Sequence, residues 1–178
     1  MAALLKILLK VAAALVILAL LIITLLMVSF GWQMRQVNRE RVEDNDRRTV
    51  PEVVDLTVLR EVWEADHTVF DFCHSRVSTI AEDQLTAWLN ELAATDLDTS
   101  SIYRGWMNTP GSVWTPRCFD AADADEITRA TSEPGSYYKS YDYRVDDELN
   151  PSWVHHFTLI DGENGRIYQQ TMSARPPG

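Results

Sequence analysis

Residues 11–30 read VAAALVILALLIITLLMVSF, an uncharged stretch in which Thr24 and Ser29 are the only polar side chains. Twenty residues of α-helix rise about 30 Å, which is the thickness of the hydrocarbon core of a bilayer. The two hydroxyl groups can hydrogen-bond to carbonyls in the preceding helical turn, so they do not oppose insertion. A core helix of a soluble protein would have a polar face, and this stretch has none. We therefore predict that it is a transmembrane helix.

The residues on either side of the apolar stretch are typical of membrane interfaces. Lys6 and Lys10 precede it, and Trp32 and Arg35 follow it, where basic and aromatic side chains would lie at the level of the headgroups. A cleaved signal peptide is the alternative, because residues 29–31 (SFG) form a weak small-x-small site. The apolar run is longer than the usual core of about 7–15 residues in a signal peptide. An uncleaved, single-pass signal-anchor is therefore our prediction.

The rest of the chain is acidic. From residue 49 onward there are nine Lys and Arg against 22 Asp and Glu, a formal charge of −13. A domain of this charge repels phosphate backbones, so we expect no nucleic-acid partner. Pro51 disfavours helical geometry in the residue before it. We therefore place the transmembrane anchor at residues 1–32, a charged stalk or linker at 33–50 and an acidic globular domain at 51–178.

Two patterns compete over the side of the membrane that the domain occupies. Lys6 and Lys10 favour a cytoplasmic N-terminus, whereas five arginines between residues 35 and 48 favour a cytoplasmic domain. The presence of two cysteines suits an oxidising compartment. We predict a domain outside the cytoplasm, in the periplasm if the source is bacterial, and the cytoplasmic domain is the alternative.

Three helices are predicted in the domain. Residues 53–76 place several apolar side chains on one helical face, although Val54, Leu56 and Val58 alternate as in a strand. Thr79 and Glu82 form a capping-box pattern. Leucines and a tryptophan follow it at the spacing of an amphipathic helix, namely Leu85, Trp88, Leu89 and Leu92. The third helix starts at Asp120 and runs to about residue 131, since an aspartate is a preferred N-cap.

Strands dominate the C-terminal part. Residues 137–145, 153–161 and 166–173 are rich in aromatic and β-branched side chains. Residues 161–165 (DGENG) predict a tight hairpin between the last two strands. Two short strands at 101–107 and 112–115 are predicted around the Pro110-Gly111 turn. The expected fold is α+β, with two to three helices packed on an antiparallel β-meander.

Cys73 and Cys118 are the only cysteines in the chain. If they pair, the bond closes a loop of about 45 residues and stabilises the fold by roughly 4 kcal/mol on the chain-entropy estimate. The alternative is two buried thiols, which a cytoplasmic domain would keep reduced.

The sequence contains none of the common catalytic, metal or nucleotide motifs. There is no CxxC, HExxH, GxSxG or P-loop. His67 and His74 would share one face of the predicted first helix, whereas His155 and His156 would point to opposite faces of a strand. We therefore predict no metal, no cofactor and no catalytic residue, and we favour a protein that is not an enzyme.

Aromatic side chains are the remaining candidates for a functional surface. Four of them lie in the irregular segment or on a sheet face, namely Trp106, Trp114, Tyr103 and Tyr138. Such residues are enriched at protein interfaces and stack on sugars, although packing in a core is the ordinary explanation. The sequence favours a noncatalytic accessory, scaffold or assembly subunit of a larger membrane complex, for which an energy-transducing complex is one setting. Its partners would be other membrane protein subunits and the lipid bilayer. The alternatives are a membrane-tethered binding domain for a glycan or secreted ligand, and then a hydrolase.

Overall fold

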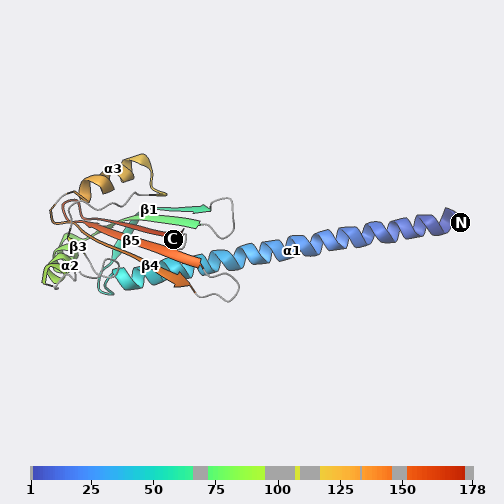
Figure 1. Ribbon diagram of the computed structural model, residues 1–178, viewed down its shortest axis with the longest axis horizontal. Coiled ribbons are helices and arrows are strands. Elements are labelled where there is room, and N and C mark those ends of the chain that lie inside the picture. The colour runs from blue at the N-terminus through green and yellow to red at the C-terminus, as the bar shows by residue number, and fades with distance from the viewer. Residues whose placement is uncertain are drawn as a thin grey trace. The chain divides into compact units, whose positions relative to one another are not determined.

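The computed structural model describes residues 2–65, 72–94, 107–108, 117–132, 134–145 and 152–174. Its elements confirm the predicted α+β class: a long N-terminal helix, two further helices and an antiparallel sheet (Figure 1). The chain divides into two compact units, residues 1–39 and residues 40–178. Each unit is described by itself.

The first unit consists of helix α1 (Ala2–Thr49) as far as Arg39. The side chains of residues 11–30 are exposed, and the helix contains a segment long and apolar enough to cross a membrane. Trp32 and Arg35 are exposed just after this segment. Lys10 is exposed before it, and Lys6 lies in the helix with its side chain outside the described set.

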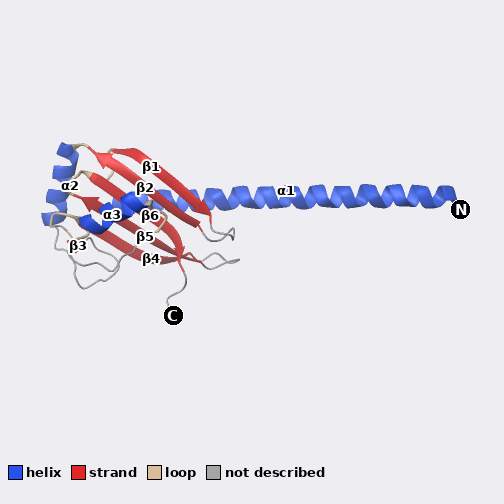
Figure 2. Cartoon of the chain, turned by 90° about the horizontal axis from the view of Figure 1, so that it is seen from above, coloured by secondary structure: helices blue, strands red, loops and turns tan. Residues whose placement is uncertain are grey.

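The second unit contains a six-stranded antiparallel sheet in the order β1-β2-β6-β5-β4-β3 (Figure 2). Its last three strands confirm the prediction, as β4 (Tyr137–Val145), β5 (Ser152–Asp161) and β6 (Arg166–Ala174). The predicted hairpin between β5 and β6 is present, with Asp161 opposite Arg166. Gly165 takes a φ of +61° in this turn, which a glycine adopts without steric cost.

The prediction of a helix over residues 53–76 is wrong. This stretch contains β1 (Leu56–Ala65) and the start of β2 (Phe72–Ile80), which pair antiparallel. The register shifts between Val58 and Arg60, so Leu59 is an extra residue that interrupts the alternation of apolar side chains. That interruption produced spacings of three and four residues, which resemble a helical face.

The other two helices agree with the sequence. Helix α2 (Glu82–Ala94) buries Leu85, Trp88 and Leu92, but Thr79 is the penultimate residue of β2 and does not cap it. Helix α3 (Ala121–Ala130) begins as predicted, since the Asp120 side chain accepts a hydrogen bond from the backbone N–H of Asp123. Of the two short strands predicted around Pro110, only β3 (Met107–Asn108) lies within the described residues.

The two faces of the sheet are covered by different elements. Helix α3 covers one face, which we call the α3 face (Figure 1). There, Ile127 and Ala130 pack on Val77, Phe157, Leu159 and Tyr168. The opposite face, which we call the α1 face, is covered by α2 at one end and by residues 40–49 of α1 over the rest. The end of α1 is therefore part of the core of the second unit.

Candidate functional site

The α1 face has a belt of polar side chains between two apolar clusters. Val42, Phe72 and Val154 form the cluster at one end, and Trp88 of α2 packs with Ile160 and Ile167 at the other. The side chains between these clusters are mostly buried and polar. We call them the polar layer: Asn45, Asp46, Glu61, His74, Arg76, Tyr141, His156, Thr158, Gln169 and Thr171.

The pairing of the strands lines up the polar layer in two rows. In the first row, Gln169 of β6 lies opposite Arg76 of β2 and opposite Thr158 of β5. The second row runs from β2 to β4 through His74, Thr171, His156 and Tyr141. Alternate residues of a strand point to the same face, so both rows face α1.

Asp46 connects the helix to the first row. Its carboxylate accepts a hydrogen bond from the Arg76 guanidinium at 2.5 Å and another from Nε2 of Gln169 at 2.6 Å. The Arg76 side chain is 18% exposed, so this ion pair is largely shielded from water. Removing one member of a buried pair costs more than the pair itself contributes, because the other charge is left without compensation.

Asn45 connects the helix to the second row. Its Nδ2 donates to Oγ1 of Thr171 at 3.4 Å, and its Oδ1 accepts from the Tyr141 hydroxyl at 3.2 Å. Oγ1 of Thr171 also lies 2.8 Å from Nδ1 of His156. Burial, together with His155, Arg48 and Arg41, lowers the pKa of His156 to about 3.

The second histidine of the polar layer, His74, pairs with Glu61 at the edge of the layer. Nε2 of His74 lies 2.7 Å from the Glu61 carboxylate, which also accepts from Arg76 at 3.1 Å. Burial lowers the pKa of His74 despite its bond to Glu61. Burial raises the pKa of Glu61, but the bonds from His74 and Arg76 outweigh it and leave this pKa lowered. Both directions describe a neutral imidazole that donates to an ionised carboxylate.

Lys139 of β4 is the only lysine after residue 10, and its side chain reaches the C-terminal end of α1. Its ammonium group donates to the carbonyl oxygen of Arg48 at 3.1 Å, one of the carbonyls that a helix C-terminus leaves unpaired. A cation is favoured at this end of a helix. Burial and the nearby Arg48 charge disfavour the protonated form, so they lower the pKa of Lys139.

Comparisons with protein-family models, with curated proteins and with solved structures find no match for this chain.

The chemistry open to the polar layer is limited by its burial. The His74 and Glu61 pair has the partners of a general acid and base, but the His74 side chain is only 1% exposed, and His156 is fully buried. Neither imidazole can contact a substrate while α1 covers the face. Among the described residues, no group of three or more His, Cys, Asp or Glu side chains could hold a metal ion. The arrangement is suited to holding a helix in place and to responding to protons.

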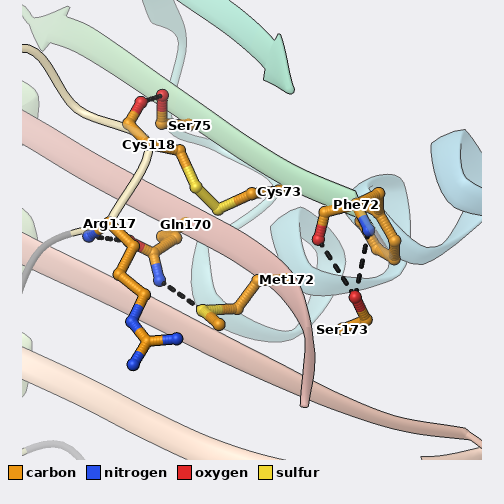
Figure 3. Close-up of a disulfide and its surroundings, with 8 residues drawn as sticks. All are labelled: Phe72, Cys73, Ser75, Arg117, Cys118, Gln170, Met172 and Ser173. Atoms are coloured by element: carbon orange, nitrogen blue, oxygen red, sulfur yellow. Dashed lines mark hydrogen bonds between the residues drawn. A yellow bond between two sulfur atoms is a disulfide. The ribbon is translucent and has the colours of Figure 1, made fainter. Parts of the chain in front are cut away.

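The two cysteines lie on the α3 face. Cys73 of β2 is joined to Cys118 by a disulfide, with Cα atoms 6.1 Å apart (Figure 3). The Ser75 hydroxyl donates to the carbonyl of Cys118 at 2.5 Å, and the backbone N–H of Arg117 donates to Gln170 at 2.9 Å. These contacts attach the segment before α3 to the sheet.

Most of the aromatic residues proposed as an interaction surface cannot be placed. Trp106, Trp114 and Tyr103 lie outside the described residues, as does His67. Tyr138 is half-buried on the α3 face, where its ring stacks on Phe157 at a centroid distance of 6.2 Å. His155 and His156 point to opposite faces of β5, as the strand assignment implied.

The contribution of α1 to the polar layer was missed from the sequence. Asn45 and Asp46 lie in the charged stretch that was assigned to a stalk or linker. A signal was present, because Val42, Asn45, Asp46 and Thr49 follow the i, i+3, i+4, i+7 spacing of one helical face. Three of these four residues are polar, so a search for apolar periodicity does not detect the face.

Proposed function

We propose that the chain is a single-pass membrane protein whose acidic domain acts as a noncatalytic accessory, scaffold or assembly subunit of a larger membrane complex. The observation that carries the proposal is the closed polar layer. Its acid-base groups bind one another and α1, so they are committed to internal structure. A domain built in this way offers a folded surface to partners.

The anchor rests on the composition of α1. Its apolar segment is long enough to cross a bilayer, and its side chains at residues 11–30 are exposed, as they would be toward lipid or neighbouring membrane helices. Trp32 and Arg35 follow the segment at the level where headgroups begin. A domain outside the cytoplasm is the proposed topology, and the disulfide between Cys73 and Cys118 supports it because such bonds persist in oxidising compartments.

The experiment is extraction of the tagged full-length chain from native membranes in a mild detergent, followed by native gel electrophoresis and mass spectrometry. The proposal expects comigration with other membrane proteins at a fixed stoichiometry. A matched control replaces residues 11–30 with a Leu/Ala helix of equal length, which keeps the anchor and removes its specific side chains. Loss of the complex in this control assigns assembly to the membrane helix, and retention assigns it to the acidic domain. A chain that migrates alone or as a small homo-oligomer contradicts the proposal.

A further inference from the structure

His156 lies at the centre of the α1 face, beneath the last turns of α1. Its side chain is fully buried, and its ring lies 5.1 Å from the ring of Tyr141. Asn45 reaches it through the Thr171 hydroxyl. The imidazole is therefore enclosed by β4, by β6 and by a helix that crosses the sheet.

Among the described residues, the neighbouring groups that act on the charge of His156 all oppose its protonation. Helix α1 contributes Arg41 and Arg48, both of which oppose its protonation, as does His155 on the same strand. Strand β4 contributes Lys139 and the Tyr141 hydroxyl, and β6 contributes the uncharged Gln169 and Thr171. A proton taken up at His156 would add a buried cation to this group.

The two carboxylates of the polar layer, Asp46 and Glu61, bind other groups. Asp46 of α1 binds Arg76 and Gln169, and Glu61 of β1 binds His74 and Arg76 of β2. Neither is among the groups that act on His156. Burial is the largest cause that disfavours a charge on the His156 ring, because a protein interior solvates a charge poorly. A proton is therefore accepted at this ring at much lower cost when water can reach it.

Residues 42–49 of α1 are what excludes water from this side. They are held by directional bonds from Asn45 and Asp46, by the hydrogen bond from Lys139 to the Arg48 carbonyl, and by one small apolar contact from Val42. Helix α3, in contrast, is held by a larger apolar cluster that contains no histidine, together with ion pairs to Arg60, Asp161 and Arg166. Local opening requires the loss of fewer apolar contacts at α1 than at α3.

We propose that the end of α1 is an acid-sensitive latch: when the pH falls, uptake of a proton by His156 releases residues 42–49 from the sheet. The released state exposes the two polar rows and their histidines. The latch lies wholly within the second unit and is independent of the proposed function.

The direction of the pH effect on the docked helix follows from the difference in the pKa of His156 between the docked and released states. The docked state binds the proton only near pH 3, whereas an exposed histidine binds it near pH 6.5. The docked state is therefore favoured above about pH 6.5 and loses stability relative to the released state as the pH falls below that value. From pH 7 to pH 5 the ratio of released to docked helix should rise about twentyfold.

The test is hydrogen–deuterium exchange of the full-length protein in detergent micelles at pH 7 and pH 5, corrected for the intrinsic exchange rate. We expect amides of residues 42–49 to exchange about twentyfold faster at pH 5, while residues 121–130 of α3 keep their protection. His156→Gln should remove most of this acid response, whereas His155→Gln should keep it. The proposal is overturned if the wild type shows no response, if α3 opens together with α1, or if His156→Gln responds like the wild type.

A second measurement covers the case in which His156→Gln does not fold. The ring signals of His156 in the wild-type protein can be followed by NMR over the same pH range. The proposal expects protonation of this ring to accompany the faster exchange of residues 42–49. A ring that stays neutral while α1 opens, or becomes charged while α1 stays protected, would refute it.

Discussion

The two faces of the sheet hold their helices by different means. On the α3 face, Ile127 and Ala130 pack on Phe157, Leu159 and Tyr168. Ion pairs between α3 and the strands surround this apolar centre: Asp120 and Asp123 with Arg60, Glu126 with Arg166, and Arg129 with Asp161. On the α1 face, Asn45 and Asp46 are held by hydrogen bonds and by the ion pair with Arg76. Apolar packing is non-directional and insensitive to pH, whereas a polar contact requires each partner in place and in the right protonation state. Charged contacts thus surround an apolar centre beneath α3, whereas polar contacts fill the centre of the interface beneath α1.

Truncation at the centre of the α3 face should have the largest effect. The Phe157 side chain is fully buried in the apolar cluster. Phe157→Ala removes its contacts and leaves a cavity, so we expect the free energy of unfolding to fall by about 3–5 kcal/mol. Denaturant titration of the full-length protein in micelles, followed by tryptophan fluorescence, measures the change. Phe157→Leu is the control and should lose under about 1.5 kcal/mol; equal losses in the two variants would argue against tight packing here.

Loss of the disulfide comes next, and it also affects the α3 face. The bond closes a loop of 45 residues between β2 and the segment before α3. Cys73→Ser with Cys118→Ser should lower the free energy of unfolding by about 2–4 kcal/mol, because the unfolded chain regains the freedom of that loop. Reduction of the wild type with dithiothreitol should give a similar loss. Serine variants as stable as the oxidised protein would show that the bond contributes nothing to folding.

Two buried threonines on the α1 face provide a matched pair. The Thr171 hydroxyl serves both Asn45 and His156, whereas the buried Oγ1 of Thr158 has no hydrogen-bond partner among the described residues. Thr171→Val leaves two partners unsatisfied and should cost about 1–3 kcal/mol. Thr158→Val removes only an unsatisfied hydroxyl and should be neutral or slightly stabilising. Equal effects in the same denaturant titration would show that the polar layer is not a specific network.

The different contacts on the two faces also explain which parts of the fold could be predicted from the sequence. Several elements stabilised by apolar contacts are predicted correctly: α2 from Leu85, Trp88 and Leu92, and the strands β4 to β6 from their aromatic and β-branched residues. Strand β2 is the exception, although Val77 and Ile80 belong to the apolar clusters. Helix α3 was identified from its cap at Asp120. These signals are local, so one segment is enough to read them.

The polar layer could not be predicted in the same way. Asn45, Arg76 and His156 come from segments up to 111 residues apart (Asn45 to His156), and each has the polarity of an ordinary surface residue. Only the register of β2, β6 and β5 brings them beneath α1. The error over residues 53–76 made this harder, because it placed His74 and Arg76 on a helix instead of in the sheet.

The smallest predicted effect concerns the first turn of α3 and separates two roles of one side chain. Asp120 accepts a hydrogen bond from the backbone N–H of Asp123 at 2.9 Å, and it also pairs with Arg60, which has a second partner in Asp123. Asp120→Ala removes the cap and should lower the free energy of unfolding by about 1 kcal/mol. Asp120→Asn keeps an oxygen for the cap and loses only a half-exposed ion pair, so it should stay within about 0.5 kcal/mol of the wild type. If denaturant titration shows equal losses for the alanine and asparagine variants, the ion pair with Arg60 holds α3, and the α3 face depends on charge more than its apolar cluster implies.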